Sequence, residues 1–443
     1  MTAHYQIRGS GSAAIVASVE TGVRSGALPA GTILPAVRAL AAELGVAPGT
    51  VATAYQVLRQ RGVVETAGRR GTRVRSRPSV ASPRSARRLP VPPGAVDLAA
   101  GGPDERLLPP LAAHLARLRP ASVDYDQGGP LPELVAAARD RLAADRVPTA
   151  HAAITVTAGA LDGIERVLAT HVRPGDPVAV EDPGWANLLD LVAALDLRPV
   201  PVPVDDDGPR PESLARALTA GARAVVVTAR AHNPTGASVG AGRAAELREI
   251  LAGYPDVLLV EDDHAAELAT VPAHPLAGAT SRWAFVRSVA KPYGPDLRLA
   301  LCAGDEATIS RVEGRMRLGT GWVSTILQRL VLELWSDAAV TAAVDRARDS
   351  YARRREGLLA ALAARGVTAH GRTGLNVWVP VPDETATVAA LRDAGYVVAA
   401  GSAYRIGSPP AVRVTISRLD PSDLEPLADA IAAAVRPTGR RSV

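Results

Sequence analysis

Short apolar segments alternate with longer stretches of helical spacing through most of the chain beyond residue 150. The apolar segments lie at Ala153–Val156, Pro177–Val180, Ala224–Val227, Val257–Val260, Ala284–Val286 and Leu297–Cys302. Between them, stretches such as Ala160–Val172 and Gly240–Ala252 place apolar residues at the spacing of a helix. This alternation predicts an α/β domain with a mostly parallel sheet. The Ala-rich stretch Val340–Arg365 predicts one long helix that leads into a smaller C-terminal α+β part.

The first 75 residues have a different pattern. Val37–Gly45 predicts a short helix closed by Gly45, and Thr50–Gly62 predicts a second helix after a short turn. Two short extended runs then flank an Ala-Gly-Arg-Arg-Gly turn that carries Arg69 and Arg70. Helix, turn, helix and hairpin wing together indicate a DNA-binding module. The alternative from this pattern alone is a small helical packing module with a solvated basic face.

Composition limits the class of protein. The chain has 443 residues, of which 47% are hydrophobic and 21% charged, as in globular proteins. The single cysteine, Cys302, excludes an internal disulfide framework. Charged residues and prolines interrupt every apolar stretch, and the N-terminus carries no secretory pattern. We therefore expect a soluble cytoplasmic protein with no membrane partner and no metal site.

Charge is distributed unevenly along the chain. Residues 1–95 contain thirteen Arg, three Glu and no Asp, a net charge of +10, so residues 96–443 carry −5 of the total +5. Residues 76–95 are rich in Pro, Ser, Ala and Arg and contain no acid. The sequence thus predicts a DNA-binding domain at 1–75, a flexible linker at 76–95 and a body at 96–443, with double-stranded DNA as partner of the first part.

Lys291 is the only lysine among fifty basic residues. It follows an apolar strand, with Ser288 three residues before it and Arg298 seven residues after it. A lysine amine forms a Schiff base with an aldehyde cofactor, and a hydroxyl and a guanidinium would hold that cofactor's phosphate. The alternative is that Lys291 is a surface loop residue and Arg298 forms a strand-end ion pair.

Polar groups also follow the other predicted strands. The strand ending at Val260 leads into Glu261-Asp262-Asp263-His264, where a carboxylate would keep a pyridine nitrogen protonated or would bind magnesium. Asn233 lies in a tight turn after Val227, and Trp185 follows Val180 and offers an indole for stacking. Gly159 and Ala160 lie at a strand-to-helix turn, where backbone amides bind phosphate.

The N-terminal motif resembles the GntR-type winged helix, in the stretch from Leu34-Pro35 through Thr50-Val51 and Ala54-Tyr55 to Gly71-Thr72. The resemblance implies that Arg38 contacts DNA, that Thr50 contacts a phosphate and that Gly71 forms the wing tip. The chain has Ala47-Pro48 where the family usually has a polar pair such as Ser-Arg, so one base-contacting arginine is missing.

The order of the body motifs resembles that of fold-type I aminotransferases, and the whole chain is similar to MocR/GabR-type regulators. The resemblance implies pyridoxal 5′-phosphate as the cofactor, joined to Lys291 as an aldimine, with Asp262 on its pyridine nitrogen and Asn233 on its ring hydroxyl. It further implies a set of remaining contacts: Trp185 stacked on the ring, His264 in place of the family's Tyr beside the hydroxyl, and Gly159, Ala160, Ser288 and Arg298 around the phosphate.

Two further residues follow from the same resemblance. Arg413 matches the arginine that binds a substrate carboxylate, with a structural ion pair as the alternative. Tyr125 matches a cofactor-binding element near the interface of a homodimer.

Three functional hypotheses fit these residues. The leading one is a pyridoxal-phosphate-dependent transcriptional regulator that senses an amino acid or amine through Lys291. The second is a working aminotransferase with an accessory winged helix. The third is a regulator whose body has lost the cofactor and serves only to dimerise.

Overall fold

The computed structural model describes residues 5–60, 63–66, 71–74, 84, 90–120 and 122–435. The chain divides into two compact units, Met1–Arg87 with Asp190–Arg198, and Arg88–Leu189 with Pro199–Val443. The predicted boundaries at residues 75 and 95 stay predictions, because much of the segment between them lies outside the described residues.

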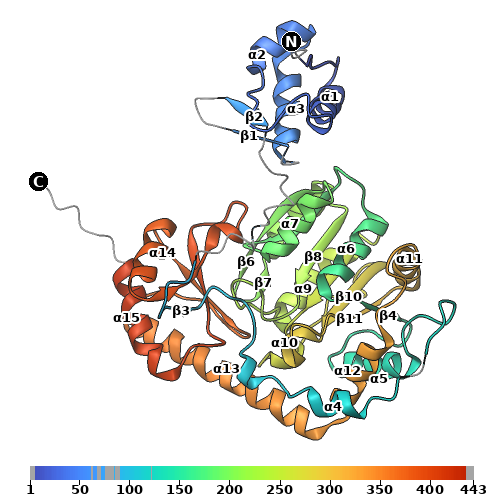
Figure 1. The fold of residues 1–443 in the computed structure, drawn as a ribbon, viewed down its shortest axis with the longest axis vertical. Coiled ribbons are helices and arrows are strands. Elements are labelled where there is room, and N and C mark those ends of the chain that lie inside the picture. Colours follow the sequence, from blue (N-terminus) through green and yellow to red (C-terminus); the bar gives the residue numbers. More distant parts are fainter. Residues whose placement is uncertain are drawn as a thin grey trace, which may run out of the picture. The chain divides into compact units, whose positions relative to one another are not determined.

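The described residues up to position 74 of the N-terminal unit form three helices and a two-stranded hairpin (Figure 1). The elements are α1 (Ser12–Arg24), α2 (Val37–Leu44), α3 (Pro48–Gln60), β1 (Val64–Thr66) and β2 (Thr72–Val74). Gly45 closes α2 with a positive φ of 66°, as a C-terminal glycine does. Helix α3, which was predicted to start at Thr50, begins two residues earlier at Pro48, because proline suits a first helical turn.

Helix α1 was not among the predicted elements, yet it completes the small core of this unit. Its Ile15 and Val19 are fully buried and pack in one cluster with Leu40 of α2 and with Val51 and Leu58 of α3. The hairpin strands β1 and β2 pair in antiparallel register and contribute Val64 and Val74 to the same cluster. The unit therefore has its own hydrophobic core.

An eight-stranded sheet forms the centre of the body, in the order β4-β11-β10-β9-β8-β5-β6-β7. The strands are β4 (Ala153–Thr157), β5 (Pro177–Asp182), β6 (Arg198–Asp205), β7 (Gly208–Pro209), β8 (Ala224–Thr228), β9 (Leu258–Asp263), β10 (Arg282–Ser288) and β11 (Ala300–Gly304). Strands β5, β8, β9 and β10 pair in parallel, whereas β11 runs antiparallel to both β10 and β4. The α/β class is confirmed, and the sheet is mixed: its central strands are parallel, as predicted, whereas β11 and β7 run antiparallel to their neighbours.

Strand β11 begins at Ala300, so the predicted start at Leu297 was wrong. The backbone turns at 294–299, where Leu297 N–H donates to Gly294 and Leu299 N–H donates to Leu297. Strand β6 was also missed, since its Pro199, Pro201 and Pro203 obscure the strand pattern.

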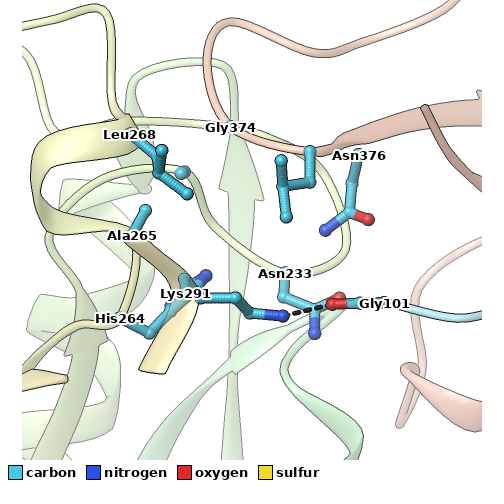
Figure 2. A pocket seen from close by; sticks show the side chains of 10 residues that line it. Gly101, Asn233, His264, Ala265, Leu268, Lys291, Gly374 and Asn376 are labelled. Atoms are coloured by element: carbon cyan, nitrogen blue, oxygen red, sulfur yellow. Dashed lines mark hydrogen bonds between the residues drawn. The ribbon is translucent and has the colours of Figure 1, made fainter. Parts of the chain in front are cut away.

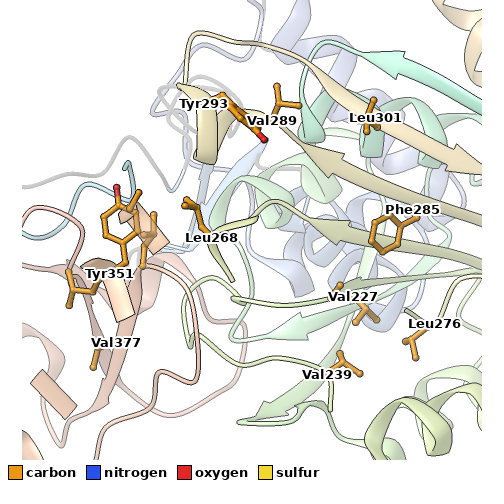
Figure 3. Packing of buried hydrophobic residues seen from close by; sticks show 14 of the residues in the cluster. Val227, Val239, Leu268, Leu276, Phe285, Val289, Tyr293, Leu301, Tyr351 and Val377 are labelled. Atoms are coloured by element: carbon orange, nitrogen blue, oxygen red, sulfur yellow. The ribbon is translucent and has the colours of Figure 1, made fainter. Parts of the chain in front are cut away.

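Helices surround the strands of the body (Figure 1). They are α4 (Ala112–Arg117), α5 (Pro132–Ala144), α6 (Ala160–His171), α7 (Ala186–Ala194), α8 (Pro211–Thr219), α9 (Ala241–Ala252), α10 (Ala290–Tyr293), α11 (Glu306–Arg317) and α12 (Thr325–Ser336). Of these, α5, α6, α8 and α11 pack directly on strands of the sheet, and α4 packs on α12. The strand interiors are fully buried, as continuous apolar strands of a covered parallel sheet require. Figure 3 shows Val227, Phe285 and Leu301 of this core, with Tyr351 and Val377 of the C-terminal part in the same cluster.

The smaller C-terminal part is α+β, as predicted. It comprises α13 (Ala338–Ala364), β12 (Asn376–Pro380), α14 (Glu384–Asp393), β13 (Tyr396–Val397), β14 (Ala399–Ala400), β15 (Ala411–Thr415) and α15 (Leu424–Val435). Strand β3 (Val96–Asp97) pairs with β13, so the chain enters the body through this C-terminal part. In the described parts of the chain, no helix has the length and apolar character that crossing a membrane requires.

Candidate functional site

A pocket lies between the strand ends of the large sheet and the loops of the C-terminal part (Figure 2). Its lining residues are Gly101, Ala231, Asn233, His264, Ala265, Leu268, Lys291, Gly374, Leu375 and Asn376. Three of the predicted site residues, Asn233, His264 and Lys291, are therefore brought together although they come from three separate segments of the chain.

Lys291 lies in the single turn α10, directly after β10. Its Nζ donates a hydrogen bond to the carbonyl oxygen of Gly101 (Figure 2). Burial, together with the positive charge of Arg413, lowers the pKa of Lys291 to about 8, although Asp262 acts in the opposite direction. The ordinary value is 10.5, so a far larger fraction of this amine is neutral at physiological pH. A neutral amine is the form that attacks a carbonyl.

The two carboxylate oxygens of Asp262 have different surroundings. Its Oδ2 lies 3.1 Å from Nδ1 of His264, whereas its buried Oδ1 has no hydrogen-bond partner among the described residues. A buried carboxylate oxygen is costly to leave unpaired. The protonated nitrogen of a pyridine ring would satisfy Oδ1, so the site fits the predicted cofactor on an observation independent of the sequence pattern.

The predicted contact of His264 with the ring hydroxyl remains untested. Its Nδ1 is engaged by Asp262, so only Nε2 is left for a ligand in this arrangement. The imidazole lines the pocket and is partly exposed. The structure thus adds a role for His264 that the sequence did not indicate, the fixing of Asp262.

The residues predicted to contact the phosphate lie at or after the ends of the neighbouring strands β10 and β4 and directly before β11. Ser288 pairs with Ala300 across β10 and β11, and Ala300 pairs with Thr157 across β11 and β4. This register aligns Ser288 with the turn that contains Gly159. Ser288 Oγ accepts the Ala290 N–H at 3.2 Å.

Gly159 has a φ of 97°, a conformation that residues with a Cβ rarely adopt. A Cβ at this position would lie 2.6 Å from Nη2 of Arg298, so the glycine leaves space in front of the guanidinium. The Gly159 N–H donates to the Thr157 carbonyl at 2.8 Å. Ala160 begins α6, and its amide is one of those that a helix start leaves without an intrahelical partner. Ala160 and Arg298 are therefore better disposed than the Gly159 amide to bind a phosphate.

Arg413 on β15 connects the C-terminal part with the strand-end loops. Its Nη1 donates to Oδ1 of Asn233 at 3.0 Å, and its Nη2 donates to the Ala99 carbonyl at 2.6 Å. Its guanidinium carbon lies 4.8 Å above the Tyr404 ring. A Cβ at Gly101 would lie 3.3 Å from both Nη atoms, so the glycine keeps this edge of the guanidinium open.

Two residues that were predicted to contact the cofactor, Trp185 and Tyr125, do not line the pocket. Trp185 follows β5 and is partly exposed, and it is not among the residues that line the pocket. Tyr125 is 96% exposed, and its ring meets Trp322 edge to face at 6.1 Å instead of entering the pocket of its own chain. Its predicted place at a homodimer interface stays a prediction.

Sequence reasoning missed Ala99, Gly101, Tyr404 and Asn376, all of which contact or line the site. The glycine pair at 101–102 was a weak signal. Nothing in the pattern marked the other three residues.

The predicted DNA-contacting residues lie on the winged-helix elements. Arg38 is exposed in the first turn of α2, and Thr50 is partly exposed in the first turn of α3. Gly71 precedes β2 with a φ of 87°. Arg69 and Arg70 lie outside the described residues. No group of three or more His, Cys, Asp or Glu that would hold a metal ion occurs in the part of the chain that the structure describes.

Comparison with known proteins defines the class of the chain. Residues 103–431 match the model of class I and II aminotransferases, and residues 12–74 match that of bacterial regulatory proteins of the gntR family. The vitamin B6 salvage pathway transcriptional repressor PtsJ of Salmonella typhimurium is 40% identical over 93% of this chain and 95% of its own length. The regulator TauR of Rhodobacter capsulatus is 28% identical over 82% of each chain.

The solved structures that are similar share the fold of the body. One is a kynurenine aminotransferase of Pyrococcus horikoshii, with a TM-score of 0.69 and 21% identity over 77% of this chain and 91% of that one. The chain belongs to the MocR-type regulators, in which a gntR-type winged helix precedes a class I and II aminotransferase domain. The predicted fold class and the predicted cofactor, pyridoxal 5′-phosphate, are confirmed by these matches.

The Gly159→Ala substitution tests the phosphate end of the site. The new Cβ would meet Arg298 and would also strain the backbone by about 1 kcal/mol, so the affinity for pyridoxal 5′-phosphate should fall roughly tenfold. Affinity for pyridoxal, which lacks the phosphate, should change much less. Gly175→Ala is the matched control, since Gly175 has a φ of 91° but open space around its Cβ position. Equal losses for both ligands would contradict the assignment.

The pKa of Lys291 predicts how cofactor attachment depends on pH. Only the neutral amine reacts, so the rate at which apoprotein takes up pyridoxal 5′-phosphate should rise with pH and level off above about 8. Stopped-flow absorption between pH 6 and pH 10.5 measures this profile. Because Arg413 contributes to lowering the pKa, Arg413→Met should move the midpoint upward. A wild-type midpoint near the ordinary lysine value would refute the interpretation.

Proposed function

We propose that this chain regulates transcription by coupling the state of the pyridoxal phosphate site to the binding of DNA by its winged helix. The observation that carries the proposal is the buried Oδ1 of Asp262, which has no partner among the described residues. The charge of Asp262 acts on Lys291, the only lysine of the chain, which lines the pocket. When bound, pyridoxal phosphate supplies an electrophilic carbonyl carbon and an electron-withdrawing ring.

Each residue of the site has a proposed task. Lys291 holds the cofactor covalently, Asp262 keeps the ring nitrogen protonated and Asn233 holds the ring hydroxyl, with His264 orienting Asp262. Trp185 stacks on the ring. Four groups bind the phosphate: Ser288, Arg298 and the amides of Ala160 and Gly159, the last after its bond to Thr157 is released.

The process under control is proposed to be the supply of vitamin B6. This rests on PtsJ, which is named for the vitamin B6 salvage pathway, and on PdxR of Corynebacterium glutamicum, a pyridoxine biosynthesis regulator that is 32% identical over 56% of this chain. The cofactor would then be the signal itself. The second candidate signal is an amino acid or amine that reacts at Lys291. It is favoured by Arg413, a guanidinium that suits a carboxylate, because Gly101 has no Cβ to occupy the space beside both Nη atoms.

The proposed assembly is a cytoplasmic homodimer. Four large apolar side chains are exposed on α4, on α12 and in the loops near them: Leu115, Tyr125, Leu318 and Ile326. Helices α4 and α12 contact each other, and Tyr125 contacts Trp322 next to α12. A second subunit would cover this surface, and two winged helices would then contact two half-sites on DNA.

The Lys291→Arg substitution tests the regulatory proposal. Arginine keeps the charge but stays protonated, so it cannot attack a carbonyl. Wild type should show the visible absorption of the lysine-bound cofactor and retain it covalently after borohydride reduction, and the variant should do neither. DNA affinity of wild type should shift on addition of pyridoxal 5′-phosphate, whereas that of the variant should not.

The same titration separates the two signals. A shift with pyridoxal 5′-phosphate alone identifies the cofactor as the signal, and a shift that requires an added amino acid or amine identifies the second candidate. If the variant responds as wild type does, the coupling does not pass through Lys291.

Salt dependence tests the DNA-binding role of the basic N-terminal segment. Logarithmic affinity should fall linearly with logarithmic salt concentration, and Arg38→Ala should reduce the slope by about one. Arg392→Ala is the control, because Arg392 lies on α14 of the acidic body and pairs with Asp393 at 2.8 Å. Equal slopes for both variants and wild type would exclude a phosphate contact by Arg38.

A further inference from the structure

Asp182, the last residue of β5, holds a loop of the C-terminal part with four hydrogen bonds. Its Oδ1 accepts from the Ile406 N–H at 2.9 Å and from Ser408 Oγ at 2.9 Å. Its Oδ2 accepts from the Gly407 N–H at 2.8 Å and from the Ser408 N–H at 3.0 Å. The residue is 4% exposed, so these four hydrogen bonds lie away from water.

The loop that Asp182 holds also carries the aromatic ring beneath Arg413. The Tyr404 carbonyl accepts from the Gly184 N–H at 2.7 Å, so the loop is fastened to the turn after β5 at two points. The Tyr404 ring lies 4.8 Å below the Arg413 guanidinium and meets Trp378 edge to face at 6.2 Å. The position of this loop therefore determines the surface on which Arg413 rests.

The neighbouring acid, Glu181, contacts the segment that leads to Asn233, the other residue that holds Arg413. Its buried Oε2 accepts from the backbone N–H and hydroxyl of Thr228 at 3.1 and 2.7 Å, and it lies 3.2 Å from Nε2 of His232. His232 precedes Asn233, the residue that accepts from Arg413. Two consecutive acids of β5 thus fix the two elements between which Arg413 is held.

We propose that Asp182 is a positioning residue for the binding of a ligand carboxylate at Arg413. It acts at a distance, by fixing the loop 404–408 and hence the plane of the guanidinium. A bidentate pair between a guanidinium and a carboxylate is sensitive to this plane, because both N–H groups must point at the ligand together. The proposal rests on the proposed function, in which Lys291 holds the cofactor and Arg413 receives a carboxylate.

Asp182→Asn is the informative change. Asparagine has nearly the same shape, but its amide nitrogen would face backbone N–H groups that are donors themselves. At least one buried donor of the loop would lose its acceptor, which favours displacement of the loop. In the described part of the chain, the hydrogen bonds of the Asp182 side chain go to residues 406–408, which neither line the pocket nor belong to the predicted phosphate contacts, so attachment of the cofactor should persist.

Two carbonyl reagents measure the effect on holoprotein. Aminooxyacetate and O-methylhydroxylamine both displace the Lys291 nitrogen from the cofactor by forming an oxime, but only the first carries a carboxylate. The ratio of their second-order rate constants, followed by loss of the visible absorption, reports recognition of the carboxylate. Asp182→Asn should lower this ratio roughly tenfold, and the rate with O-methylhydroxylamine should stay within about twofold of wild type.

Three further variants complete the test. Asp383→Asn is the matched control, since Asp383 accepts a backbone N–H at the start of α14, away from the site, and should leave the ratio unchanged. Arg413→Lys should lower the ratio at least as far as Asp182→Asn. Ser408→Ala removes one of the four bonds from the loop side and should lower the ratio less, which keeps the proposal testable if Asp182→Asn does not fold.

The outcomes distinguish the two levels of the proposal. A normal ratio in Asp182→Asn and Ser408→Ala, with a reduced ratio in Arg413→Lys, would overturn the role of Asp182 and leave Arg413 in place. A parallel loss of both rates in Asp182→Asn would show that Asp182 supports the cofactor and not the carboxylate site. A wild-type ratio that Arg413→Lys does not change would reject the assignment of Arg413 and the role of Asp182 with it.

Discussion

The hydrogen bond between Arg413 and Asn233 joins the two parts of the body at the functional site. Asn233 belongs to a loop of the large sheet, and Arg413 belongs to the small C-terminal sheet. The second contact of Arg413, with Ala99, ties the entry segment of the body to the same point. Lys291 then contacts Gly101, two residues further along that segment. The guanidinium of Arg413 thus connects a loop of the large sheet, the small sheet and the entry segment, and two of these segments contribute Asn233 and Gly101 to the pocket lining.

A second group of buried charges keeps the strand that carries Asp262 in place. The neighbouring Asp263 is fully buried between Arg230 and Arg287, with N–O distances of 2.8 to 3.0 Å, and both arginines also contact Asp145. These two guanidinium groups hold the pKa of Asp263 well below its usual range despite its burial. A buried ion needs such partners, and removal of one partner leaves an uncompensated charge. The cluster therefore fixes the end of β9 through Asp263, the residue next to Asp262, whose side chain points to the other face of the strand.

The two units place different demands on their residues. In the N-terminal unit, a core of aliphatic side chains and Tyr55 supports short helices. The arginines whose burial is described up to position 74, Arg8, Arg38, Arg59 and Arg73, are exposed. In the body, arginines are drawn into the interior, where Arg230, Arg287, Arg355 and Arg413 are nearly inaccessible to solvent. Arginine suits such positions because its planar group makes several hydrogen bonds at once and stays charged. The single lysine, Lys291, occupies the position where burial lowers the pKa of the amine and favours its neutral form.

The sequence by itself determined the features that depend on local pattern and on residue identity. The alternation of apolar and helical segments predicted the α/β body, Gly45 predicted the end of a helix, and the uniqueness of Lys291 marked a residue that the structure places in the pocket. The order of the motifs after the strands, through its resemblance to aminotransferases, implied that Asn233, Asp262 and Lys291 belong to one site at the carboxyl ends of the strands.

Only the tertiary structure decided which distant segments complete the site. Ala99 lies 314 residues from Arg413, and Asp182 lies 224 residues from Ile406. Such contacts depend on how the small sheet packs against the large one, and no local periodicity encodes that packing. The pairing of His264 with Asp262 was equally hidden, since it depends on a side-chain rotamer and not on spacing. The types of residue in the sequence indicate which chemical groups a site can contain, whereas the packing of the whole fold determines which separate segments form the site.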